Sequence, residues 1–426
     1  MTDSSRRSAS LADALLGAAQ LIAAVIGGRT IDGALAASPL VGATRAAAMD
    51  IAYTTLRAFG RGDFLLDQLL ARPAKDALAR SLLLAALARL EARPDDAHTT
   101  VDQAVTAATG LARGQYKGLV NGVLRNFLRR RDDLLAQAEA DPVARWRHPA
   151  WWIARLRQDH PAHWQSVLAA GNSHPPMCLR VNRRRTTSAG FLAQLADAGI
   201  GARALDATAV LLDTPIPVER LPGFAEGLCS VQDSGAQAAA RLLDIGDGMR
   251  ALDACAAPGG KTAHLLETAE LELTALDADP RRAARIGDTL RRLGLEATIK
   301  AADARAVDDW WDGRPYDRIL ADVPCSASGV VRRHPDAKWL KRESDIDGFA
   351  ATQQAIVDAL WRTLARGGKM LYATCSVFAA ENAHQVDAFV GRHEDARRLA
   401  MPVDAQPHHL PDAEHDGFYY ALLQKD

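Results

Sequence analysis

The spacing of apolar residues along the chain changes twice, and each change predicts a different kind of structure. From residue 9 to about 138, apolar residues recur at helical spacing between Gly and Pro interruptions, and no alternating strand pattern stands out. The front of the chain is therefore predicted to be all-helical. From about 141 to 228, a tryptophan-rich bridge precedes a strand-like run at 177–182 and a helical pattern at 188–198, which predicts a small α+β module.

Beyond residue 228, strand patterns and helix patterns alternate. Short apolar runs predict strands over 249–254, 272–276, 298–300, 318–320 and 369–373, and helices begin near 262, 280 and 350. Such repetition predicts a doubly wound, Rossmann-like α/β domain with a parallel sheet. We therefore expect three domains, with boundaries at 1–140, 141–228 and 229–426.

Composition adds limits to this picture. The 426 residues carry a formal net charge of −1, but residues 1–235 are net +5 and the remainder is net −6. A basic front indicates an anionic partner. The five cysteines include no Cys-x-x-Cys pair and no Cys/His cluster at zinc spacing, so we expect neither a disulfide framework nor a metal site. A reducing cytoplasm and a monomer fit this composition.

One feature near the beginning of the chain resembles an export signal. Arg6-Arg7 precedes an apolar stretch over 11–28, but Asp13 and Gln20 interrupt it, and its continuous apolar core is too short for an export signal. A first amphipathic helix explains the pattern better. No apolar run reaches the roughly 18 residues that a membrane span requires.

Candidate ligand-binding residues follow the first three strands of the α/β domain. The run DACAAPGGKT over 253–262 opens a helix, and its small residues allow backbone amides to approach a ligand. It matches neither G-x-G-x-x-G nor the phosphate-binding P-loop. Asp277 ends the next strand, where a carboxylate can accept hydrogen bonds from ribose hydroxyls. Asp303 follows the third strand, where it can receive an adenine amino group. Either aspartate alone is a weak signal, because many surface aspartates only cap helices.

Two cysteines follow the later strands. Cys325 lies in the run DVPCS and Cys375 in the run YATCS, each directly after an apolar strand. Residues at the carboxyl ends of parallel strands line the ligand crevice of an open sheet, so these are candidate nucleophiles. The alternative is that both are buried core thiols, which we expect of Cys178 and Cys229.

Together these motifs resemble the S-adenosylmethionine-dependent RNA 5-methylcytosine methyltransferases. The resemblance extends through GVVRRHPD at 329–336 and DGFYY at 416–420, and VNGVL at 120–124 resembles the RNA-binding NusB module. It covers nearly the whole chain, and the combination of motifs is specific. It implies that the substrate is cytosine 967 of 16S rRNA; another rRNA or tRNA cytosine is the alternative.

The resemblance also implies roles for single residues. Cys375 is the nucleophile that adds to C6 of the cytosine, Cys325 assists release, and Asp322 contacts the cytosine's N3 and amino edge. Cys255 contributes backbone and packing only. The cofactor S-adenosylmethionine is bound by Ala254, Cys255, Ala256, Ala257, Pro258, Gly259, Gly260, Lys261, Asp277, Asp303 and Asp322.

Basic side chains are the candidate RNA contacts, because phosphates are bound by Lys and Arg. They form three groups: Arg129 and Arg130 at the end of a front helix, Arg183 and Arg184 after the first strand of the small module, and the stretch with Arg332, Arg333, Lys338, Lys341 and Arg342. The simpler explanation for Arg129 and Arg130 is a favourable charge at a helix C-terminus. The bridge tryptophans are expected to pack at an interface, with base stacking as the alternative.

Two rival functions compete with this interpretation. One is a methyltransferase that uses Cys325 as its nucleophile, as DNA cytosine methyltransferases use their Pro-Cys motif, but Thr374-Cys375-Ser376 disfavours it. The other is a non-catalytic RNA-binding antitermination protein, based on the helical front, which the cofactor loop and the two cysteines disfavour. Binding of S-adenosylmethionine separates them, because an antitermination module has no reason to bind it.

Overall fold

The front of the chain is helical in the computed structural model, which describes residues 10–401 and 408–426. Ser10 caps the first helix by accepting a hydrogen bond from Asp13 N. Residues 82–87 are all buried within α5, so this helix is surrounded by the others. The helices are α1 (Leu11–Ile26), α2 (Ile31–Ala36), α3 (Gly42–Arg57), α4 (Phe59–Leu69), α5 (Ala77–Ala92), α6 (Ala97–Ala107), α7 (Lys117–Arg129), α8 (Arg131–Ala140), α9 (Pro142–Trp146), α10 (Ala150–Asp159) and α11 (Trp164–Asn172).

The chain divides into two compact units, and each of them combines two separate stretches of the sequence. The helical unit comprises residues 1–173 together with 331–342, and the second unit comprises 174–330 and 343–426. Residues 331–342, which contain α17 (Ala337–Leu340), therefore belong with the front helices although they follow the first cysteine motif. The domain boundaries at 140 and 228 stay predictions.

Lys338 anchors residues 331–342 within the helical unit. Its side chain is fully buried, and Nζ donates to the main-chain oxygens of Arg57 (3.1 Å) and Arg147 (3.0 Å) and to Asn172 Oδ1 (2.9 Å). Burial lowers the pKa of this amine well below its usual value. The prediction that Lys338 faces RNA phosphates is therefore wrong, because its amine is buried and donates to oxygen atoms inside the helical unit. In the bridge, Trp152 is buried as expected, and the rings of Trp146 and Trp164 pack 5.0 Å apart.

A four-stranded antiparallel sheet opens the second unit. Its strand order is β2 (Ala202–Ala204), β3 (Ala209–Leu212), β1 (Cys178–Val181) and β4 (Cys229–Val231), and α12 (Ser188–Asp197) supplies Phe191 and Leu195 to its core. This confirms the predicted α+β module. Cys178 and Cys229 are buried, as expected of core thiols.

The large sheet contains the predicted parallel strands in the order β9, β8, β5, β6 and β7. Their bounds are β5 (Arg250–Ala254), β6 (Glu272–Asp277), β7 (Thr298–Ala301), β8 (Tyr316–Asp322) and β9 (Leu364–Thr374). The chain leaves β5 first toward β6 and later returns on its other side as β8, so the strand order reverses between β5 and β8. Ligands of open α/β sheets bind at the carboxyl ends of the strands beside such a reversal.

An antiparallel edge extends this sheet, so the sheet is mixed and the expectation of a purely parallel one needs correction. Strand β12 (Phe418–Lys425) pairs with β9 and carries β10 (Ala396–Arg398) and β11 (His408–His409). Residues 418–423 are buried without alternation, so period-two patterning could not reveal the strand.

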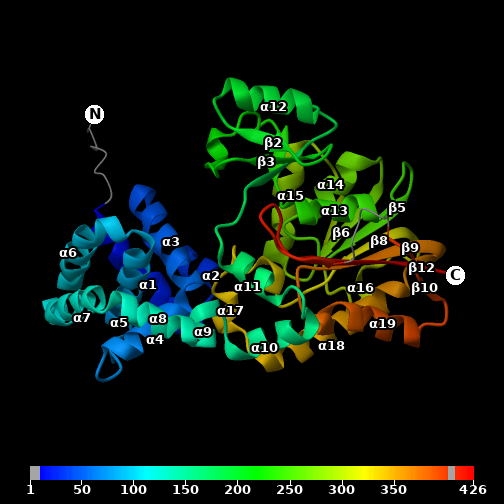
Figure 1. The fold of residues 1–426 in the computed structure, drawn as a ribbon. Coiled ribbons are helices and arrows are strands. Elements are labelled where there is room, and N and C mark those ends of the chain that lie inside the picture. The colour runs from blue at the N-terminus through cyan, green and yellow to red at the C-terminus, as the bar shows by residue number, and fades with distance from the viewer. Residues whose placement is uncertain (1–9, 402–407) are drawn as a thin grey trace. The chain divides into compact units, whose positions relative to one another are not determined.

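Helices cover both faces of the large sheet, which confirms the doubly wound arrangement (Figure 1). One face carries α13 (Ser234–Leu242), α14 (Gly260–Thr268) and α15 (Pro280–Leu293), and the other α16 (Val307–Trp310), α18 (Glu343–Trp361) and α19 (Ala383–Arg392). No helix among the described residues is long and apolar enough to cross a membrane. Arg6 and Arg7 lie outside the described residues.

Candidate active site

The loop between β5 and α14 is shaped by backbone conformations that favour glycine and small residues. Cys255 has φ +62° and Gly259 has φ +96°, both in the left-handed region. A Cβ at Gly259 would lie 3.1 Å from Ile286 Cα on α15, so a side chain there would push the two helices apart. Packing against α15 therefore requires a glycine at position 259, and approach of the loop amides to a ligand stays a prediction. Burial raises the pKa of Cys255 to about 12, so this cysteine remains a thiol.

Asp253 lies beneath the loop as a fully buried carboxyl group. Thr262 Oγ1 donates to its Oδ2 over 2.6 Å, and its Oδ1 has no hydrogen-bond partner among the described residues. Burial raises the pKa of Asp253 to about 7, partly offset by the Thr262 hydrogen bond. The group therefore titrates near neutral pH.

Asp277 ends β6 and ties the loop to the next strand. Its Oδ2 accepts from Ala257 N (3.1 Å) and lies 3.4 Å from Arg282 Nη2, and its Oδ1 accepts from Asp279 N (3.1 Å). The side chain is only 3% exposed. Asp277 thus lies at the loop, where the sequence places it.

Asp303 follows β7 and engages its own turn. Both of its carboxylate oxygens accept from the Arg305 guanidinium, and Oδ1 also accepts from Arg305 N. The Arg305 hydrogen bonds lower the pKa of this half-exposed carboxylate. An adenine contact by Asp303 would have to share these oxygens with Arg305.

Lys261 and Asp322 join the loop to the end of β8. Lys261 Nζ donates to Asp322 Oδ2 over 2.8 Å and lies 5.7 Å from the centre of the Phe418 ring. Burial alone would lower the pKa of Lys261, but the Asp322 carboxylate and Tyr420 outweigh it and raise the pKa. Lys261 and Asp322 both lie in the sequence motifs, but the motifs do not indicate that the two side chains pair. Phe418 reaches Lys261 from strand β12, which the sequence analysis did not predict.

The two cysteines meet at the ends of the adjacent strands β8 and β9. Cys325 Sγ and Cys375 Sγ lie 3.4 Å apart, although 50 positions separate the residues in sequence. The hydrogen bond with Cys375, burial and the nearby Glu381 raise the pKa of Cys325 well above its usual value. Cys325 is therefore held as a thiol.

A buried polar cluster that the sequence analysis missed lies behind the cysteines. Glu381 is fully buried, and its carboxylate accepts from Ser326 N (2.7 Å), Ser326 Oγ (2.5 Å) and Ser376 Oγ (2.5 Å). Gln353 Nε2 donates to Pro324 O over 3.0 Å, and Tyr372 Oη donates to Glu381 O over 2.6 Å. The acidic residue six positions beyond Cys375 is the only sequence signal of this cluster.

Arg180 connects the small module to the cofactor loop. It is buried on β1, donates through Nε and Nη2 to both carboxylate oxygens of Glu267 (2.8 Å each), and donates through Nη1 to Gly260 O (2.6 Å). Arg184, four residues after Arg180 and beyond the end of β1, donates to Glu270 and to Ala269 O. Arg180 lies close in sequence to the basic run at 183–185, but its charge is neutralised inside the unit by Glu267.

The remaining basic candidates differ in exposure. Arg183 is exposed, whereas Arg332 is 1% exposed and Arg333 is half-buried. A phosphate contact by Arg332 would require this side chain to leave its buried place.

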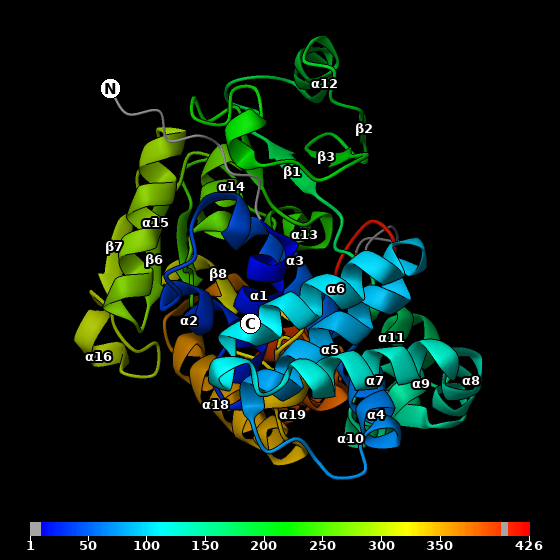
Figure 2. The same ribbon diagram turned by 90° about the vertical axis from the view of Figure 1, so that its left-hand side faces the viewer.

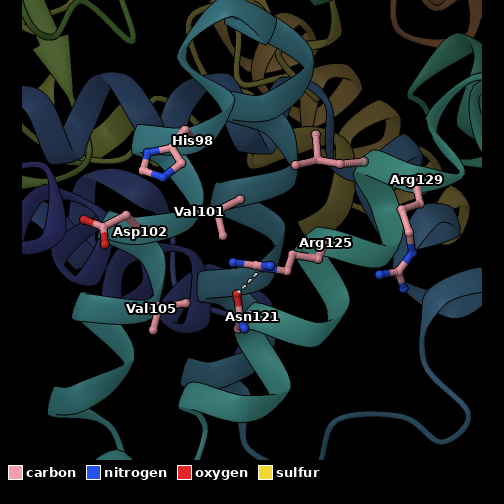
Figure 3. Close-up of a pocket in the computed structure, with 8 residues that line it drawn as sticks. His98, Val101, Asp102, Val105, Asn121, Arg125 and Arg129 are labelled. Carbon is pink, nitrogen blue, oxygen red and sulfur yellow. Dashed lines mark hydrogen bonds between the residues drawn. The ribbon is translucent and has the colours of Figure 1, made fainter.

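Arg129 is exposed at the end of α7. Arg130 is half-buried, and its Nη2 lies 3.7 Å from Asp133 Oδ2. A groove of about 670 Å³ runs between α6 and α7 beside them (Figure 3). Arg125 and Arg129 line one side, and His98 and Asp102 line the other. No group of three or more residues in the described ranges could hold a metal ion.

Comparisons with known families agree with this architecture. Residues 240–424 match the 16S rRNA methyltransferase RsmB/F family, residues 148–219 match the RsmF/B-like ferredoxin-like domain, and residues 15–129 match the NusB family. The crystal structure of PH0851 superposes with a TM-score of 0.79 over 96% of this chain and 99% of that one, at 22% identity. A methyltransferase homologue from Pyrococcus horikoshii superposes with a TM-score of 0.59 over 67% of this chain and 97% of that one, at 23% identity. The class is thus an α/β methyltransferase preceded by NusB-like and ferredoxin-like domains.

Curated relatives narrow this class. Ribosomal RNA small subunit methyltransferase B of Pseudomonas putida is 44% identical over 96% of this chain and 98% of its own length. The protein of the same name from Escherichia coli O6:H1 is 43% identical over 89% of this chain and 90% of its own length. The chain belongs to the family of ribosomal RNA small subunit methyltransferases B.

Proposed function

We propose that this protein transfers a methyl group from S-adenosylmethionine to C5 of a cytosine in 16S rRNA, at position 967, through a covalent bond between Cys375 and C6. The observation that carries the proposal is the pair of sulfur atoms 3.4 Å apart at the carboxyl ends of β8 and β9, beside the Lys261–Asp322 pair. The names of the curated relatives supply the substrate class.

The chemistry answers a difficulty of the substrate. C5 of cytosine is a poor nucleophile, and addition of a thiolate at C6 makes it an enamine-like carbon that can attack. Cys375 forms the S–C6 bond, and Asp322 hydrogen-bonds the N3 and amino edge of the ring. S-adenosylmethionine, when bound, supplies an electrophilic methyl group.

Release requires that C5 lose its proton and that the S–C6 bond then break. The electron pair of the C5–H bond becomes the C5–C6 double bond, and the pair of the S–C6 bond returns to Cys375 as a thiolate. Cys325, with its raised pKa, is a thiol in the resting enzyme. During elimination the Cys325 thiol gives its proton to the departing Cys375 sulfur and takes up the proton that leaves C5, so both cysteines end as thiols; this exchange is the assisting role we assign to Cys325.

The loop residues fit S-adenosylmethionine. A Cβ at Gly260 would meet only Gln232 Nε2, at 3.6 Å, so the backbone is not tightly covered there, and Asp253 Oδ1, just before this loop, has no hydrogen-bond partner among the described residues. Asp277 would accept from the ribose hydroxyls and Asp303 from the adenine amino group. Lys261 holds Asp322 in place between cofactor and base.

RNA contacts fall to the exposed basic side chains. Arg129, Arg130, Arg183, Arg184 and Arg333 are proposed to bind phosphates, with Arg332 contributing only if it becomes exposed on RNA binding. A flipped or single-stranded base must enter the site, because C6 is inaccessible inside a paired stem.

The proposal is tested by bisulfite sequencing of rRNA from cells that lack this protein. Loss of protection at position 967, restored by the wild-type gene and not by Cys375→Ala, is the expected result. Protection lost at another rRNA or tRNA cytosine would correct the target while keeping the chemistry. Unchanged protection throughout, with no binding of S-adenosylmethionine by the purified protein, would favour a non-catalytic RNA-binding function.

A further inference from the structure

Glu381 carries a buried carboxylate, and neither apolar packing nor contact with water would stabilise its charge there. It lies in the turn at 379–381 before α19, and its carboxylate is fully buried, where an ionised group is costly unless several donors satisfy it. Donors from both cysteine loops do so: Ser326, next to Cys325, donates through its amide and its hydroxyl, and Ser376, next to Cys375, donates through its hydroxyl. One carboxylate thus bridges the residues that follow the two sulfurs.

Further contacts hold this carboxylate in place. Tyr372 on β9 donates to the main-chain oxygen of Glu381, and Gln353 on α18 lies 3.5 Å from Oε1 and also holds Pro324 O. The next residue, Asn382, accepts from Thr374 Oγ1 and donates to Ser376 O. Both flanks of Cys375 and the amino side of Cys325 are therefore fastened to the turn that carries Glu381.

We propose that Glu381 is a positioning residue that sets the separation of the Cys325 and Cys375 sulfurs. Its two carboxylate oxygens accept hydrogen bonds from the Ser326 amide and from the hydroxyls of Ser326 and Ser376. Displacement of either cysteine loop therefore breaks a charge-assisted hydrogen bond. The inference rests on the proposed thiol chemistry, in which a proton passes between the two sulfurs. Glu381 does not contact the substrate in this arrangement and is not a catalytic residue.

The test compares Glu381→Ala, Glu381→Gln and Tyr372→Phe in the full-length protein. Alanine removes every acceptor. Glutamine keeps the size and one acceptor, and the serine hydroxyls can rotate to accept from its amide. Tyr372→Phe removes a hydrogen bond from the same cluster without touching the carboxylate, and it is the matched control for general loosening. Ser376→Ala, which detaches only the Cys375 loop, is the milder variant if Glu381→Ala does not fold.

Two measurements are made on each variant. The first is kcat and the KM for S-adenosylmethionine with transcribed 16S rRNA. The second needs no activity: the protein is treated with dibromobimane, which bridges two nearby thiols, and mass spectrometry gives the ratio of cross-linked to singly alkylated Cys325 and Cys375 peptides. This ratio reports the sulfur separation and corrects for changes in thiol reactivity.

Glu381→Ala should lower kcat about 100-fold, the cost of a displacement of about 1 Å in a reacting group. The KM for S-adenosylmethionine should not change, the cross-linked fraction should fall, and Glu381→Gln should restore most of both. Tyr372→Phe, which leaves the carboxylate and its serine donors intact, should show a much smaller loss than Glu381→Ala. An unchanged cross-linked fraction in Glu381→Ala, or an equal loss of cofactor affinity, would overturn the inference. If instead Cys375→Ala retains activity, the proposed function fails, while the cross-linking ratio still decides whether Glu381 positions the sulfurs.

Discussion

The two ends of the candidate active site are held in different ways. At the cofactor end, after β5 and β6, the contacts are local: Asp277 receives the amides of Ala257 and Asp279, and Gly259 permits close approach to α15. At the cysteine end, after β8 and β9, the loops are joined by Glu381, which lies 55 positions from Ser326. A short motif can therefore specify the first end, whereas the second depends on a side chain whose partners only the fold brings together.

The largest expected effect tests whether the two ends act independently. Cys375→Ala should reduce methyl transfer to background, because the proposed nucleophile for C6 is then absent, while the affinity for S-adenosylmethionine stays at the wild-type value. Calorimetric titration with S-adenosylmethionine and a tritiated-methyl assay measure the two properties. Weakened cofactor binding in this variant would show that the ends are coupled and would break the comparison.

Arg180→Met tests whether the cofactor end depends on residues beyond its own motif. The change leaves the buried Glu267 carboxylate unpaired, which costs about 3–5 kcal/mol of unfolding free energy. It also removes a donor from Gly260 O, so cofactor affinity should fall as well. Urea unfolding and calorimetric titration measure both.

Arg184→Met is the matched control, since its partner Glu270 is largely exposed and such pairs contribute at most about 1 kcal/mol. Equal effects of the two substitutions would contradict the role assigned to Arg180.

Asp277→Ala tests the proposed ribose contact at the cofactor end. Loss of the acceptor for ribose hydroxyls should weaken binding of S-adenosylmethionine by about 1.5–3 kcal/mol, the range for hydrogen bonds to a charged group. Asp279→Ala, which only uncaps α15, is the control and should leave affinity nearly unchanged. Unchanged calorimetric affinity in Asp277→Ala would rule out the ribose contact.

The last prediction concerns the dependence of stability on pH. Asp253 has a pKa of about 7 when folded and an ordinary value of 3.8, so between these values the folded protein keeps a proton that the unfolded chain has lost. Wild-type stability therefore falls as pH rises through this window, by at most about 1.4 kcal/mol per pH unit.

Asp253→Asn lacks this titration and can still accept from Thr262. Its stability relative to the wild type, measured by urea unfolding, should rise from about pH 4 to pH 7 and then level off. Parallel curves for the two proteins would contradict the raised pKa. Asp303→Asn is the opposite case, because the Arg305 hydrogen bonds lower the Asp303 pKa, and this variant should lose stability above the acidic range.

Sequence patterns predicted much of this molecule because they report local periodicity. The helical front, the small module and five parallel strands follow from spacing, and the expectation that Cys325 and Cys375 line the same crevice follows from their places after parallel strands. Strand β12 was not predicted, because both its faces are buried and its residues do not alternate. Its residues Phe418 and Tyr420 lie near Lys261, so this part of the site's surroundings was not predicted either.

Buried charge was the other limit of sequence reasoning. Lys338 and Arg180 read as members of basic stretches, and nothing in the neighbouring residues indicates that the first donates to buried carbonyls and the second to Glu267. The consequence is practical: deleting residues 1–140 would also remove Arg57, a partner of Lys338 in the segment that follows the first cysteine motif. Such a truncation therefore does not isolate RNA binding from catalysis.

The central claim is the division of labour between the two sulfurs, and denaturing gel electrophoresis of protein mixed with 16S rRNA and S-adenosylmethionine tests it most directly. Cys325→Ala should accumulate a covalent protein–RNA species, because Cys375 still adds to C6 while release is blocked, and Cys375→Ala should form none. Accumulation in Cys375→Ala instead, with none in Cys325→Ala, would contradict the account and make Cys325 the nucleophile.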